Sequence, residues 1–151
     1  MSSEIFVERF NDLIVFAGIT PFRLSEDTGL KLKSIHNWNR GYTYPSANAL
    51  LVLADYFQVS IDYILGLDNR EEEKSAKKEV SRQVAHDALI TALTAYMEKN
   101  QYTKYRLAKL IEVRQTTMER WFSKNAMPET AVLIRISRLL EQPLDELLGR
   151  N

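Results

Sequence analysis

The sequence predicts an all-α protein made of two five-helix domains in tandem. The first reason is an internal repeat: a shift of 83 positions places nine residues between Thr20 and Gly66 on identical residues of the second half. The pairs are Thr20/Thr103, Arg23/Arg106, Leu24/Leu107, Trp38/Trp121, Pro45/Pro128, Leu50/Leu133, Asp62/Asp145, Leu65/Leu148 and Gly66/Gly149. The second reason is that apolar residues recur at spacings of three and four, which is typical of helices with one buried side.

The composition is that of an ordinary globular protein. Of the 151 residues, 45% are apolar and 26% are charged, and two units of about 66 residues are each near the lower size limit of independent folding. No apolar run approaches the roughly 20 residues of a membrane span, and the N-terminus lacks the features of a signal peptide. We therefore expect a cytoplasmic protein. The absence of cysteine excludes disulfides, cysteine nucleophiles and thiolate metal sites.

The elements of the first half can be predicted in order. Apolar residues from Phe6 to Ala17 follow helical spacing, and Gly18 ends that helix. Thr20 is an N-cap before Pro21 in the first helical position, so a second helix is expected to run to about Thr28. After a turn at Gly29, a third helix is expected over residues 31–39, a fourth from the N-cap Ser46, and a last turn opened by Ser60 or Asp62.

The second half repeats these signals, with helices expected over 103–111 and 114–122 and an earlier one that carries Leu89 and Leu93. That earlier helix is expected to be longer than its counterpart, because residues 69–100 contain neither Gly nor Pro. The predicted organisation is a first domain over 1–67, a charged helical connector over 68–84 and a second domain over 85–151. The alternative for the connector is a flexible charged linker across residues 70–78.

The net charge is zero, but the charges are unevenly placed. Residues 29–53 contain three bases and no acid. Residues 99–124 contain seven bases and only two acids, Glu112 and Glu119. Each half thus has a basic segment at the same place in its repeat, which indicates either a solvated face or a polyanion-binding surface.

Two 20-residue stretches, Pro21 to Arg40 and Lys104 to Ser123, resemble the helix-turn-helix of the Cro and phage-repressor (XRE-like) family. The fifth residue of each stretch, Ser25 or Ala108, is small where the third helix would cross. The loops that reach Pro45 and Pro128 also resemble that family, as do the closing Asp62–Gly66 and Asp145–Gly149 turns. The resemblance implies two DNA-binding domains like that of lambda repressor.

The resemblance also implies which side chains meet DNA, since the third helix of such a domain enters the major groove. The base-facing candidates are Lys31, Leu32, Lys33 and Asn37 in the first half, and Arg114, Gln115, Thr116 and Arg120 in the second. Lysine and arginine suit guanine, asparagine and glutamine suit adenine, and apolar groups suit the thymine methyl. The candidates for contacts with the DNA backbone are Arg40, Tyr42, Tyr44, Lys104, Lys124 and Asn125.

Each half departs from the family pattern in its own way. Pro21 cannot hold a phosphate at the start of the second helix, whereas Lys104 can. Conversely, Gly29 suits the turn of the first half, but Glu112 stands where glycine is usual, which predicts either a modest backbone strain or a reshaped turn.

The expected function is a sequence-specific transcriptional regulator, a repressor that occludes its operator by using two recognition helices per chain. Because the two sets of base-facing residues differ, an asymmetric operator is expected. One alternative is that one domain binds DNA while the other, more acidic one mediates dimerisation through its fourth and fifth helices with Tyr56 or Tyr63. The other is a protein-binding adaptor or anti-repressor that never touches DNA.

No catalytic constellation, cofactor motif or small-molecule site is evident. The two histidines, His36 and His86, lie in different halves, and no carboxylate cluster accompanies either at metal-ligand spacing. The five glycines are too scattered for a phosphate-binding loop. We therefore expect no enzyme activity, no cofactor and no metal.

Overall fold

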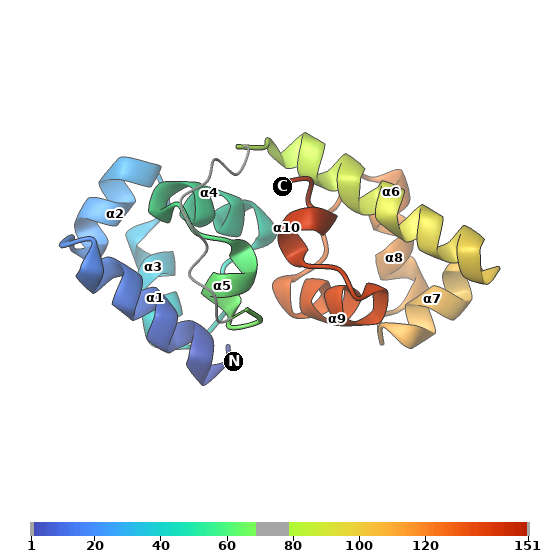
Figure 1. The fold of residues 1–151 in the computed structure, drawn as a ribbon, viewed down its shortest axis with the longest axis horizontal. Helices are drawn as coiled ribbons and strands as arrows, with labels where there is room; N and C mark the ends of the chain where they lie inside the picture. Colours follow the sequence, from blue (N-terminus) through green and yellow to red (C-terminus); the bar gives the residue numbers. More distant parts are fainter. Residues whose placement is uncertain (1, 69–78, 151) are drawn as a thin grey trace. The chain divides into compact units, whose positions relative to one another are not determined.

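A computed structural model describes residues 2–68 and 79–150, and these residues form ten α-helices and no strand (Figure 1). The predicted all-α class is confirmed. The chain divides into two compact units, Met1–Glu79 and Val80–Asn151.

The first unit contains five helices: α1 (Glu4–Phe16), α2 (Pro21–Thr28), α3 (Leu32–Asn39), α4 (Ala47–Phe57) and α5 (Ile61–Leu65). Local capping sets where several of them begin. The hydroxyls of Ser3, Thr20, Ser46 and Ser60 each accept a hydrogen bond from the backbone N–H three residues later. The predicted caps at Thr20 and Ser46 are confirmed, and the last helix of the unit is capped by Ser60 rather than by Asp62.

An aromatic cluster forms the centre of the first unit. Phe6 and Phe10 of α1 stack with ring centroids 5.7 Å apart, and the Phe10 ring meets the edge of Trp38 at 5.9 Å. Leu24 of α2 and Ile35 of α3 are fully buried. The helix α1 packs against α3 and α5, while α2 packs against α3 and α4. This packing fixes the inner side of α3 and leaves its outer side exposed.

The second unit contains α6 (Arg82–Asn100), α7 (Lys104–Leu110), α8 (Gln115–Ser123), α9 (Thr130–Leu140) and α10 (Leu144–Leu147). The hydroxyls of Ser81 and Thr103 cap α6 and α7 in the same way as in the first unit. As expected, α6 is longer than its counterpart α1, with 19 residues against 13.

The core of the second unit joins α6 to α7 and α8. Leu89, Leu93, Leu107 and Met118 are fully buried, and Trp121 is 2% exposed. The Nε2 atom of the buried His86 lies 2.8 Å from the backbone oxygen of Trp121. Because a carbonyl only accepts, Nε2 donates this bond and ties α6 to the last turn of α8.

The connector differs from the expectation where the structure describes it. Residues 79–81 are not helical, and α6 begins at Arg82 after the cap Ser81, so the long helix does not extend back through these residues. Residues 80–84, which the sequence assigned to the connector, belong to the second unit. The cap Ser81 sets the start of α6 here, although no Gly or Pro interrupts the preceding sequence. The remaining connector residues, 69–78, lie outside the described ranges.

No helix in the described part of the chain is long and apolar enough to cross a membrane.

Candidate nucleic-acid interface

The turn between the second and third helix of each unit depends on one left-handed residue. Gly29 has φ of 77° and caps α2. At the equivalent place in the second unit, Glu112 has φ of 59°. Glu112 therefore adopts the left-handed conformation that Gly29 adopts in the first unit. In the first unit the Ser25 hydroxyl also donates to the Leu30 oxygen at 2.6 Å, while in the second unit the equivalent Ala108 is 1% exposed.

The outer side of α8 carries a group of exposed polar side chains, while its inner side carries the buried Met118 and Trp121. The exposed residues are Arg114, Gln115, Thr116, Thr117 and Arg120. The side chains of Arg114 and Arg120 make no ion pair or hydrogen bond with any residue that the structure describes. Two guanidinium groups are thus available to an external acceptor.

The beginning of α8 is itself electropositive. Its N-cap is Arg114, which makes no side-chain capping bond, and α3 likewise begins after Lys31 without one. The first N–H groups of a helix have no partner within the helix, and the helix dipole adds partial positive charge there. Arg114 and Lys31 place a full positive charge beside these donors.

The outer side of α3 is less polar than that of α8. Lys31 and Lys33 are exposed, but Leu32 and Asn37 are half-buried. All four base-facing candidates of the second unit are therefore exposed, whereas only the two lysines are exposed in the first.

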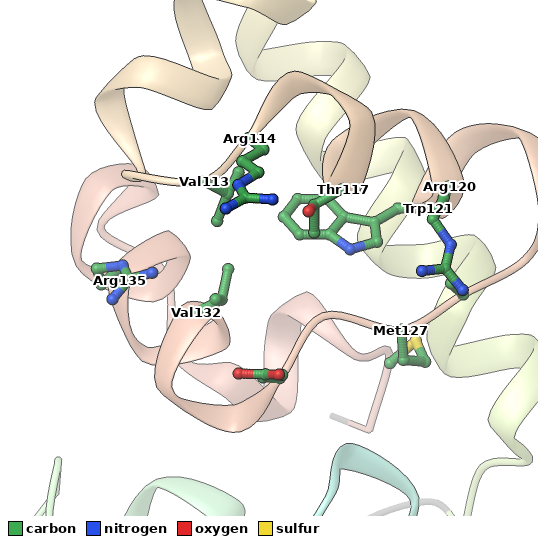
Figure 2. Close-up of a pocket in the computed structure, with 10 residues that line it drawn as sticks. Val113, Arg114, Thr117, Arg120, Trp121, Met127, Val132 and Arg135 are labelled. Carbon is green, nitrogen blue, oxygen red and sulfur yellow. The ribbon is translucent and has the colours of Figure 1, made fainter.

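A hollow of about 460 Å³ lies beside α8, between that helix, the following loop and α9 (Figure 2). Arg114, Thr117 and Arg120 line it from α8, and Val132 and Arg135 line it from α9. Val113, Trp121, Ala126 and Met127 give it apolar walls, and Glu129 is the one acid among the lining residues. The sequence did not predict this hollow or single out Thr117.

The backbone-contact candidates of the second unit differ in how far the protein engages them. Lys124 is exposed. The ammonium of Lys104 lies 3.6 Å from Glu119 and 4.6 Å from the centre of the Phe122 ring, and its side chain is 40% exposed. The Asn125 side chain bonds to Gln83 in both directions, and its backbone oxygen accepts from Arg82. These contacts tie the loop after α8 to the start of α6.

In the first unit, Arg40 and Tyr42 are exposed, whereas Tyr44 packs inward. The Tyr44 ring lies 5.5 Å from that of Phe6, and its hydroxyl accepts from the N–H of Ser3. These contacts hold the loop against α1.

The tyrosines considered for a dimer surface are engaged within the first unit. The Tyr56 hydroxyl donates to Asp27 at 2.7 Å, and the Arg9 guanidinium stacks over the Tyr63 ring at 4.6 Å. The hydrogen bond from Tyr56 lowers the pKa of Asp27, aided by Arg23 and opposed by desolvation. The prominent exposed apolar residues are instead Val15, Phe16 and Phe22, which are 70%, 79% and 61% exposed.

Within the described ranges, no group of three or more His, Asp or Glu side chains is placed to hold a metal ion. Comparisons with protein-family models, with curated proteins and with solved structures found no match. The repeat and the surfaces of α3 and α8 are therefore the features that bear on function.

Proposed function

We propose that the protein is a sequence-specific double-stranded DNA-binding transcriptional regulator of the XRE-like helix-turn-helix type. In this proposal α3 and α8 are recognition helices that enter the major groove, and the protein represses by occluding its operator. The observation that carries the proposal is the outer side of α8, where Arg114 and Arg120 are exposed and unpaired within the described residues.

The chemistry of this surface suits base edges and phosphates. Arg120 can donate two parallel hydrogen bonds to guanine, Gln115 can pair with adenine, and the Thr116 methyl can contact thymine. The uncapped start of α8 and Lys124 add donors and charge for phosphates. On α3, Lys33 and Asn37 would take the corresponding roles.

The two recognition surfaces carry different residues, so an operator that meets both consists of two unlike half-sites. Each good contact with a base is worth about 1 to 3 kcal/mol of discrimination, which is enough to separate the two halves in a selected motif. The proposal therefore includes an asymmetric operator.

A second candidate function gives DNA binding to the second unit and protein contact to the first. The observation that favours it is the start of α2, where Pro21 and the exposed Phe22 stand in place of Lys104 and Tyr105. Exposed apolar residues near a helix start disfavour a phosphate and favour a protein partner.

Selection from a random duplex library, followed by affinity measurements across a salt series, tests both candidates. The matched variants are Lys33→Glu on α3 and Arg120→Glu on α8. Loss of about tenfold or more in affinity from both variants supports two recognition helices, since each reversal removes a donor and adds repulsion. Loss from Arg120→Glu alone supports the second candidate.

Failure of the proposal has a distinct signature. If no motif is enriched and the affinity for duplexes changes little from low to high salt, phosphate contacts are absent. The protein would then belong to the adaptor or anti-repressor class.

A further inference from the structure

The hollow beside α8 combines features that a DNA contact does not require. Its apolar lining consists of the half-buried Val113, Ala126 and Met127 and small exposed parts of Trp121 and Val132, which are 2% and 8% exposed. Figure 2 shows the indole between Arg114 and Arg120. Its volume of about 460 Å³ falls in the range of small-molecule sites. Phosphates need donors and charge but no apolar wall.

The charges around the hollow favour an anion. Arg114, Arg120 and Arg135 face one acid, Glu129. Arg135 donates from Nε to the Ile111 oxygen at 2.9 Å, and its two terminal nitrogens make no hydrogen bond with the described residues. Guanidinium groups bind carboxylates and phosphates through paired hydrogen bonds. The half-buried Val113, Ala126 and Met127 offer apolar contacts to the body of such a ligand.

From this combination we propose that the hollow is a binding site for a small amphipathic oxyanion: a flat apolar body that carries one carboxylate or phosphate group. The oxyanion bonds to arginines of the lining, and the apolar body lies against Val113, Ala126 and Met127, next to the small exposed part of Trp121. Since Arg114 and Arg120 also belong to the proposed DNA surface, the bound anion competes with the operator. This competition rests on the proposed function, but the site itself does not.

The two tryptophans provide an internal control, because they occupy equivalent places in the two units. The experiment titrates the isotopically labelled protein with 2-naphthoate, with 2-naphthylmethylammonium and with inorganic phosphate, and follows both indole N–H signals by NMR. We expect naphthoate to shift the Trp121 signal with a dissociation constant of about 1 mM or tighter and to leave the Trp38 signal in place.

Three outcomes of this titration contradict the proposed site. If the ammonium compound shifts the Trp121 signal as strongly as naphthoate, the arginines do not select the ligand. If inorganic phosphate binds as tightly as naphthoate, the apolar walls contribute nothing and the site is a phosphate contact only. Absence of any Trp121 shift contradicts the proposal directly.

A matched pair of variants tests the location. Ala126→Phe places a ring in the hollow without removing a charge, whereas Ala95→Phe adds the same ring to an exposed position of α6 outside the lining. We expect Ala126→Phe to weaken naphthoate binding by about tenfold or more and Ala95→Phe to leave it unchanged. The NMR spectrum of each variant verifies its fold. Equal binding by both variants places the ligand elsewhere.

The proposed competition between the anion and the operator is tested with the duplex selected from the library. We expect saturating naphthoate to lower duplex affinity at least tenfold and 2-naphthylmethylammonium to leave it unchanged. An unchanged affinity with naphthoate bound contradicts the competition. If the protein binds no duplex but naphthoate still shifts Trp121, the anion site stands and the proposed function has failed.

Discussion

The helices α3 and α8 occupy equivalent places in the repeat, share their buried side and differ on their exposed side. Both bury a tryptophan and an aliphatic residue, Trp38 with Ile35 and Trp121 with Met118. Both helices follow a basic N-cap, Lys31 or Arg114, but their other outer residues differ, as Asn37 stands where Arg120 does. The repeat therefore preserves a scaffold while most of the outer side of this helix differs between the units.

The closing turns of the two units, at equivalent places in the repeat, are also held by different contacts. In the second unit, Arg150 pairs with Asp145, and the two residues are 1% and 3% exposed. In the first unit, Arg9 of α1 instead donates to the backbone oxygens of Tyr63 and Asp68, at 2.7 and 2.6 Å. One turn is held by a buried ion pair and the other by a cation that reaches from a distant helix.

The largest expected effect on stability comes from breaking this ion pair. Arg150→Met removes the buried cation that pairs with the Asp145 carboxylate, and breaking such a pair costs about 3 to 5 kcal/mol. Arg9→Met removes hydrogen bonds to two carbonyls and costs about 1 to 3 kcal/mol. Native-state hydrogen exchange at core amides of each unit measures both losses in the intact chain. Equal losses in the two variants would show that the buried charge has other compensation.

Much of this architecture follows from local signals in the sequence. The caps at Thr20, Thr103 and Ser46 and the left-handed Gly29 each act within a few residues, so each can be identified without the fold. The 83-residue repeat adds the pairing of the two halves. The start of α6 was missed because its charged, Gly- and Pro-free approach is typical of helix, and one serine cap decides the boundary.

The candidate site was predictable only in part. The exposure of Arg114 and Arg120 follows from helical periodicity around Met118 and Trp121. The pairing of Lys104 with Glu119, the inward packing of Tyr44 and the hollow beside α8 depend on side chains from separate elements. No spacing rule within one helix reports such contacts.

Substitutions in the turns before α3 and α8 are expected to change the free energy of unfolding in opposite directions. A Cβ at Gly29 would meet no atom within 4 Å, so Gly29→Ala costs only backbone strain, about 1 kcal/mol. Glu112→Gly relieves the same strain and is expected to stabilise the second unit by a smaller amount, about 0.5 kcal/mol, because glycine also frees the unfolded chain. Thermal unfolding of both variants measures the effects. A destabilised Glu112→Gly would mean that the glutamate side chain contributes more than its strain costs.

The smallest expected effect concerns a polar link that only the first unit has. Tyr56 bonds to Asp27, whereas the equivalent positions of the second unit are Leu139 and Leu110. Tyr56→Phe removes the main cause that holds the pKa of Asp27 below its ordinary value of 3.8. NMR titration of the Asp27 carboxyl is expected to show its pKa rising toward that value, and Tyr63→Phe serves as the control that leaves it unchanged.

The pH dependence of this link has a definite sign. A carboxyl with a lowered pKa in the folded state contributes stability above the pKa of the unfolded chain, and this contribution is lost as pH falls through the lower, folded value. Tyr56→Phe should therefore weaken the first unit slightly at neutral pH, and its difference from the parent should disappear in acid below the Asp27 pKa. A difference that persists unchanged into acid would show that Tyr56 stabilises α4 against α2 through packing, as the leucines of the second unit would, rather than through the charge on Asp27.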